Sequence, residues 1–162
     1  MKKIAPCLWF DSNAEKAVKF YLGVFKKSKM TRVARYSKVG HEQHGRPAGS
    51  VMTIAFELND QPFTALNGGP VFKFTEAISF QIDCATQAEV DYYWKKLSAG
   101  GDKKAQVCGW VKDKFGLSWQ VVPTILAKLV GDPDSAKSQR AMQAMLEMKK
   151  LDIAALQRAY EG

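Results

Sequence analysis

Apolar side chains alternate with other residues along several short segments, which predicts strands, and recur with helical spacing in other segments. The first part of the chain contains one predicted helix, over residues 13–26, and four predicted strands, over residues 4–10, 31–38, 50–58 and 63–67. Within the first strand, Leu8 and Phe10 face one side of the sheet, and Cys7 and Trp9 face the other. This part of the chain therefore has the order strand, helix, three strands.

The same order of elements recurs in the second part of the chain, offset by 72–74 residues. Its predicted elements are a strand over residues 77–83, a helix that begins after Thr86, and strands near Gln106 and over residues 108–112 and 117–122. Each predicted helix starts with a capping box, which is Ser12 with Glu15 in the first and Thr86 with Glu89 in the second.

An internal repeat of this kind predicts an α+β fold. Residues 1–122 are predicted to hold two tandem βαβββ modules, at about residues 4–70 and 75–122, that form a cup-shaped mixed sheet. Residues 123–162 are predicted to form a C-terminal helical extension, because residues 132–134 (DPD) are a helix-start signal and Asp152 can cap a last short helix. A structural or interaction role through this extension is one hypothesis for its function.

Composition and charge narrow the classes of function. The chain has 162 residues, 46% of them hydrophobic, and a net charge of +8, and residues 1–50 alone carry 11 Lys and Arg against 3 Asp and Glu. Because no basic run is interleaved with exposed aromatic residues, we expect no nucleic-acid partner. We interpret the excess charge as a solvated basic face, and the alternative is the attraction of an anionic small molecule. No apolar run approaches the roughly 18–20 residues of a membrane span, so no membrane partner is expected.

The three cysteines, Cys7, Cys84 and Cys108, lie far apart and form no CxxC pair. An odd number of separated cysteines suits a reducing compartment, so we predict a cytoplasmic protein without a disulfide framework. The simplest interpretation is that all three are small, half-buried strand residues. The alternative is a reactive thiol, which would be tested first at Cys7.

Strand alternation also predicts which side chains line the inside of the cup. The candidate ligand-binding residues are Cys7, Trp9, Glu57, Asn67, Ser79, Gln81, Trp110 and Gln120. Apolar and amide side chains of this kind suit a small organic molecule held by shape, stacking and a few hydrogen bonds. Glu57 and Asp83 are the carboxylates with the parity for acid–base chemistry, but their simplest interpretation is solvated residues near strand ends.

Several stretches make the chain similar to a known family. They are residues 6–11 (PCLWFD), 56–63 (FELNDQPF), 65–70 (ALNGGP), 78–80 (ISF), 109–110 (GW), 113–120 (DKFGLSWQ) and, in the extension, 142–145 (MQAM) and 153–156 (IAAL). The chain resembles the PhnB-like branch of the vicinal oxygen chelate superfamily, to which glyoxalases, extradiol dioxygenases and bleomycin-resistance proteins belong. This branch is often labelled demethylubiquinone methyltransferase-like. The resemblance implies paired βαβββ modules and a homodimer.

For metal-dependent members, the resemblance implies His, Gln and Glu ligands on the first and last strands of each module. The first strands offer Ala5 or Cys7 in the first module and, in the second, Ala77 with Ser79 and Gln81 in the same parity. The last strands offer Thr64, Ala65 or Asn67 in the first module and Gln120 in the second. This set is poor in the imidazole and carboxylate ligands of an open divalent site, so we expect no cofactor. The favoured prediction is a small-molecule-binding protein with its reaction unassigned, and the alternative is a metal-dependent lyase, isomerase or dioxygenase.

The residues give the methyltransferase label no support. A doubly wound methyltransferase needs a glycine-rich turn after its first strand, and residues 11–15 (DSNAE) contain no glycine. The two histidines, His41 and His44, lie in the glycine-rich segment 40–49, which we interpret as a surface loop. The alternatives for this pair are metal binding and a pH-sensitive lid over the cup.

Overall fold

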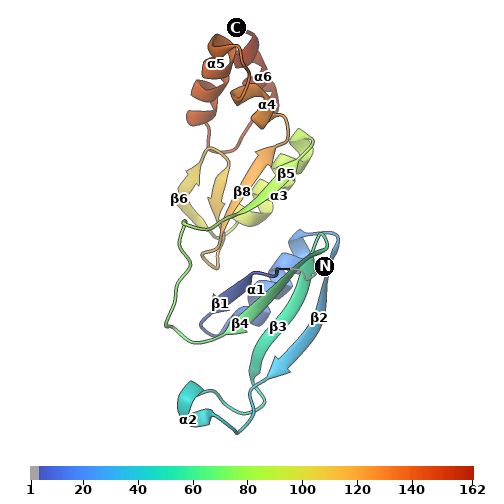
Figure 1. Cartoon of the computed structure of the whole chain (residues 1–162), viewed down its shortest axis with the longest axis vertical. Helices are drawn as coiled ribbons and strands as arrows, with labels where there is room; N and C mark the ends of the chain where they lie inside the picture. The colour runs from blue at the N-terminus through green and yellow to red at the C-terminus, as the bar shows by residue number, and fades with distance from the viewer. Residues whose placement is uncertain (1–3) are drawn as a thin grey trace. The chain divides into compact units, whose positions relative to one another are not determined.

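A computed structural model describes residues 4–162 and divides them into two compact units. Unit 1 is the chain up to Phe74, and unit 2 begins at Thr75 and continues to Gly162. Figure 1 shows unit 1 in blue and green and unit 2 from green through yellow to red. Each unit contains its own four-stranded sheet.

In unit 1 the strand order is β1-β4-β3-β2. These strands are β1 (Cys7–Phe10), β2 (Ser28–Arg35), β3 (Val51–Leu58) and β4 (Gln61–Asn67), and the helices are α1 (Ala14–Val24) and the single turn α2 (His41–His44). β1 pairs with β4 in parallel, and the other neighbours are antiparallel. α1 covers one face of this sheet (Figure 1), and its buried side chains meet the apolar residues of the strands there, such as Leu8, Phe10 and Phe56.

In unit 2 the strand order is β5-β8-β7-β6. These strands are β5 (Phe80–Cys84), β6 (Asp102–Val107), β7 (Trp110–Lys112) and β8 (Ser118–Pro123), and the helix between β5 and β6 is α3 (Gln87–Ser98). β5 pairs with β8 in parallel, and the other neighbours are antiparallel. Buried Ile82, Val111 and Val121 form the core between this sheet and α3.

The predicted repeat is therefore confirmed, because both units have the order strand, helix, three strands and the same sheet connectivity. The fold class is α+β, and the predicted mixed sheet consists of two four-stranded sheets, one in each unit. The largest boundary error concerns β2, which spans residues 28–35 where the alternation predicted residues 31–38. β2 is an edge strand with mostly exposed side chains, so its hydrophobic pattern constrains its ends only weakly.

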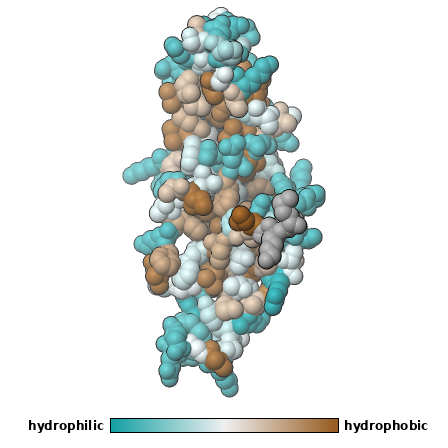
Figure 2. All heavy atoms as spheres, in the orientation of Figure 1, coloured by the Kyte–Doolittle hydropathy of each residue, from teal (hydrophilic) through white to brown (hydrophobic). Residues whose placement is uncertain are grey.

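Three further helices follow β8 within unit 2: α4 (Leu126–Val130), α5 (Ser135–Leu146) and α6 (Ile153–Glu161). Asp134 and Asp152 cap α5 and α6 by accepting hydrogen bonds from backbone amides, as the sequence predicted. A small core of Leu129, Ala141, Leu151 and Leu156 joins the three helices. Figure 2 shows mainly hydrophilic side chains at their outer end. Among the described residues, none of the helices has the length and apolar character needed to cross a membrane.

Candidate functional site

Three of the predicted ligand-binding residues lie side by side in unit 2. Gln120 of β8 pairs in register with Gln81 of β5 and with Trp110 of β7. Residues paired in register place their side chains on the same face of a sheet, so these three form one row across three strands. In each unit, we call the face of the sheet that is opposite α1 or α3 the open face. The row lies on the open face, and all three side chains are at least partly exposed.

Hydrogen bonds hold the two amides of this row. Gln120 Nε2 donates to Ser79 Oγ at 2.9 Å, and Gln81 Nε2 donates to Asp83 Oδ1 at 2.7 Å. Each bond orients one amide and leaves it with additional donor and acceptor capacity. Ser79, Gln81, Trp110 and Gln120 are thus brought onto one face, as the strand alternation predicted.

Trp9 and Cys7 lie on the open face of unit 1. The Trp9 indole donates from Nε1 to the carbonyl of Gly69 at 2.8 Å, and its ring meets Phe72 edge-on at 4.9 Å between centroids. A side chain at Gly68 would come within 2.3 Å of the indole, so this ring requires glycine beneath it. Partial burial raises the pKa of the Cys7 thiol, which lowers the fraction of nucleophilic thiolate.

Glu57 lies on the same face but is already paired. It is in register with Lys29 of β2, and its carboxylate is 3.2 Å from the Lys29 ammonium group. This ion pair stands near the end of the sheet, one register step from the β3–β4 turn at residues 59–60. The pairing agrees with the simpler interpretation of Glu57, a solvated residue near a strand end.

Asn67 lies on the opposite face, so the prediction that it shares a face with Cys7 and Trp9 is wrong. It pairs in register with Phe10 and is only 6% exposed. Its Oδ1 accepts from the Ala14 amide at 2.9 Å, and its Nδ2 donates to Glu15 Oε2 at 2.8 Å and to the Val51 carbonyl at 3.0 Å. Asn67 therefore caps α1 from the sheet.

This contact replaces the capping box predicted at Ser12 and Glu15. The residue before α1 is Asn13, and its side chain makes no capping hydrogen bond. Glu15 interacts with Asn67 instead of closing back on the helix start. In unit 2 the predicted box is confirmed, because Glu89 N donates to Thr86 Oγ1 at 3.2 Å and Thr86 N donates to Glu89 Oε2 at 3.2 Å.

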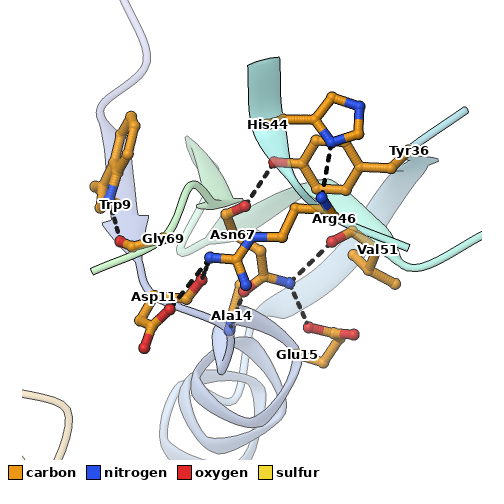
Figure 3. Close-up of polar contacts among 10 residues, drawn as sticks. All are labelled: Trp9, Asp11, Ala14, Glu15, Tyr36, His44, Arg46, Val51, Asn67 and Gly69. Atoms are coloured by element: carbon orange, nitrogen blue, oxygen red, sulfur yellow. Dashed lines mark hydrogen bonds and ion pairs between the residues drawn. The ribbon is translucent and has the colours of Figure 1, made fainter. Parts of the chain in front are cut away.

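A polar cluster that the sequence did not predict surrounds Asn67 (Figure 3). Tyr36 Oη donates to the Asn67 carbonyl at 2.6 Å. Arg46 Nη2 donates to the Asp11 carbonyl at 2.8 Å and to Asp11 Oδ1 at 3.2 Å, and the Arg46 amide donates to His44 Nδ1 at 3.0 Å. These residues come from separate segments, so no spacing along the chain indicates that they meet.

The two units differ in net charge. Residues 1–74 contain 12 Lys and Arg against 5 Asp and Glu, a net charge of +7, whereas residues 75–162 contain 12 against 11, a net charge of +1. The excess positive charge therefore belongs to unit 1, which can attract anionic molecules.

The donors at the positions that match the superfamily's ligands do not fit a resident divalent metal. Cys7 carries a thiol of raised pKa, Ala5 and Ala77 have no donor in the side chain, and Gln120 is bonded to Ser79. His41 and His44 lie one helical turn apart in α2, with ring centroids 5.9 Å apart. Within residues 4–162, no group of three or more His, Cys, Asp or Glu side chains is arranged to hold a metal ion.

Paired βαβββ units define the class of protein, the fold of the vicinal oxygen chelate superfamily. Residues 2–122 match the family model described as 3-demethylubiquinone-9 3-methyltransferase, and the chain belongs to this family, the PhnB-like branch of that superfamily. No curated protein matches the chain.

Two solved structures are similar to the chain. One is a PhnB protein from Bacillus cereus, described as a candidate 3-demethylubiquinone-9 3-methyltransferase, with 30% identity, a TM-score of 0.65 and coverage of 76% of this chain and 100% of that one. The other is protein PA1353 from Pseudomonas aeruginosa, with 18% identity, a TM-score of 0.57 and coverage of 76% and 98%. About a quarter of this chain thus has no counterpart in either structure.

Proposed function

We propose that this protein binds a small organic molecule on the open faces of its sheets, without the chelating metal of its superfamily. The observation that carries the proposal is the row of Gln81, Gln120 and Trp110 in unit 2. An indole offers a stacking surface, and two neighbouring amides offer both donors and acceptors. Such a row suits an uncharged or weakly anionic ring that carries polar substituents.

The interactions of the carboxylates within the protein favour binding without catalysis. Asp83 accepts a hydrogen bond from Gln81, and Glu57 forms an ion pair with Lys29. Both groups on the open faces are thus engaged within the protein, whereas a general base has to reach a proton of the substrate. The reaction class stays unassigned.

The family is described by a methyltransferase activity, and we do not extend that activity to this chain. Each sheet is mixed, with one parallel pair of neighbours and two antiparallel pairs, unlike the parallel doubly wound sheet of many nucleotide-binding enzymes. β1 leads to α1 through residues 11–13, which contain no glycine. Neither feature supports binding of a nucleotide-like methyl donor at this turn.

The proposal is tested by a thermal-shift screen of small aromatic and carbonyl compounds, followed by titration of each hit. Gln120→Leu places in unit 2 the residue type that Leu66 supplies at the same position of unit 1. We expect about tenfold weaker binding, because one hydrogen bond to the ligand is lost. Gln139→Leu, at an exposed position of α5, is the matched control and should bind as the unmodified protein does. Equal affinity of both variants would contradict the proposed row.

The alternative is a metal-dependent lyase, isomerase or dioxygenase. Elemental analysis of protein purified without chelators or affinity tags tests it directly. We expect far less than one divalent ion per chain. One ion per chain, retained on dialysis, would favour the alternative and overturn the metal-free proposal.

We also propose that residues 1–122 carry the binding function and that the helical extension, residues 123–162, supports unit 2. The family model ends at residue 122, and the extension is tied to the sheet by hydrogen bonds from the Cys108 and Gly109 amides to the carbonyls of Met148 and Lys149. Deleting residues 123–162 should lower the stability of unit 2 and leave any ligand contacts of unit 1 intact.

A homodimer in the cytoplasm completes the proposal. The superfamily resemblance supports the dimer, and light scattering of the purified protein tests it. The three free cysteines, at Cys7, Cys84 and Cys108, support a reducing compartment. Fractionation of the source cells tests the location.

A further inference from the structure

Unit 1 contains a hollow of about 220 Å³ whose lining includes only one of the predicted ligand-binding residues, Asn67. It lies beside the start of α1, and its lining includes Glu15, Tyr36, Arg46, Ser50, Val51 and Asn67. One water molecule occupies about 30 Å³ of liquid, so the hollow has room for a molecule of a few heavy atoms. Figure 3 shows most of this lining gathered around Asn67.

Two opposite charges line this hollow without meeting each other. The Glu15 carboxylate accepts from Asn67 Nδ2, and the Arg46 guanidinium is held by Asp11. Within the described residues, Arg46 forms an ion pair with Asp11 and none with Glu15. Asn67 thus fixes the carboxylate, Asp11 fixes the guanidinium, and space is left between the two charges.

The hydroxyl groups of the hollow present acceptors. Tyr36 Oη donates its only proton to the Asn67 carbonyl at 2.6 Å, and Ser50 Oγ donates its only proton to the Pro47 carbonyl at 2.6 Å. Both oxygens can therefore only accept from a ligand. Together with the free lone pairs of Glu15, they offer acceptors that match the three N–H donors of an ammonium group.

The guanidinium offers the opposite chemistry. Arg46 Nη2 is occupied by Asp11, and its Nη1 and Nε groups make no hydrogen bond within residues 4–162. A guanidinium edge with vacant donors suits a carboxylate, which accepts two parallel hydrogen bonds. The hollow therefore combines an ammonium-binding side with a carboxylate-binding side.

We propose that this hollow binds a small zwitterion of the α-amino-acid type. Its ammonium group faces Glu15, Tyr36 and Ser50, and its carboxylate faces Arg46. The site is separate from the row on unit 2 and does not rest on the proposed function, because it uses other residues of another unit. Failure of either proposal leaves the other standing.

Titration of the full chain with glycine, followed by amide chemical shifts in NMR, tests this site. Acetate and methylamine each carry one of the two charges, and glycerol carries neither. We expect glycine to shift the amide signals of Ala14 and Val51. Acetate and methylamine should bind about tenfold more weakly than glycine, and glycerol should cause no shift. The proposal would be overturned if glycine caused no shift at these amides, or if glycerol caused shifts as large as those of glycine.

Glu15→Gln assigns the ammonium side, since the amide oxygen still accepts from Asn67 while the charge is removed. We expect about tenfold weaker glycine binding and unchanged acetate binding. The control is Glu42→Gln, an exposed carboxylate of α2 outside the hollow, which should bind glycine normally. Tyr36→Phe is a second, independent variant that removes one acceptor and should weaken glycine a fewfold. Undiminished glycine binding by both Glu15→Gln and Tyr36→Phe would contradict the assignment.

Discussion

The helix that follows the first strand begins differently in the two units. In unit 2 the start of α3 is capped within four residues, by Thr86 and Glu89. In unit 1 the start of α1 is capped by Asn67, which is 53 residues away from Ala14 along the chain. The same βαβββ architecture thus tolerates a local cap in one copy and a cap from the sheet in the other, because either one satisfies the free amides of the first turn.

The open faces differ in a corresponding way. The row of Gln81, Gln120 and Trp110 in unit 2 occupies the positions of Trp9, Leu66 and Thr53 in unit 1. The aromatic residue changes strand between the copies, and the central residue changes from leucine to glutamine. Unit 1 combines this more apolar row with the net charge of +7, so the two copies offer different chemistry on one scaffold.

The largest effect is expected when the cap from the sheet is removed. Asn67→Ala leaves the Ala14 amide, the Val51 carbonyl and the Glu15 carboxylate without a buried partner, and should lower the free energy of unfolding by about 3 kcal/mol. Chemical denaturation measures this loss. The matched control is Asn13→Ala, because the Asn13 side chain makes no capping hydrogen bond. This variant should lose at most about 0.5 kcal/mol of its free energy of unfolding. Similar losses in the two variants would show that Asn67 is not the cap.

A second difference between the units lies near the end of the first strand of each unit. It predicts that stability depends on pH in the alkaline range. Residue 84 of unit 2 corresponds to Ser12 of unit 1, but it is a fully buried cysteine. Burial, with smaller contributions from Glu89 and Asp83, raises the pKa of the Cys84 thiol to about 11. Between about pH 9 and 11 the unfolded chain loses this proton while the folded protein keeps it, so stability falls as pH rises, by about 2–3 kcal/mol.

Denaturation curves at pH 8 and pH 11 measure this loss. Cys84→Ala should remove most of the thiol-dependent part of the pH difference, even though the variant is less stable at both pH values. Cys7→Ala, at an exposed cysteine, should retain most of it. If the two variants have the same dependence on pH, buried Cys84 is not its source.

The smallest effect concerns the local cap. Thr86→Ala removes the acceptor for the Glu89 amide and should cost about 1 kcal/mol. The corresponding change in unit 1, Ser12→Ala, should cost close to nothing, because Asn67 performs the capping there. Thermal unfolding of both variants checks the difference. A loss at Ser12 equal to that at Thr86 would restore the capping box that the sequence predicted.

Local sequence patterns predicted the repeat and most elements of the fold. Alternation at Leu8 and Phe10, and helical spacing after Thr86, depend only on residues that are near one another in the chain, so they identify strands, helices and core faces. The same alternation could also have placed Asn67 correctly, because it has the parity of buried Phe63 and Ala65. A polar residue at a core position was the available signal.

The contacts between polar groups, in contrast, depend on the packing of distant segments. The row of Gln81, Gln120 and Trp110 depends on strand register, and the hollow near Arg46 depends on how the loop before β3 lies against the end of β1. Register and loop placement are set by the packing of the whole unit, since each contact joins segments tens of residues apart. Local patterns therefore predicted the scaffold, and long-range packing assembled the candidate sites.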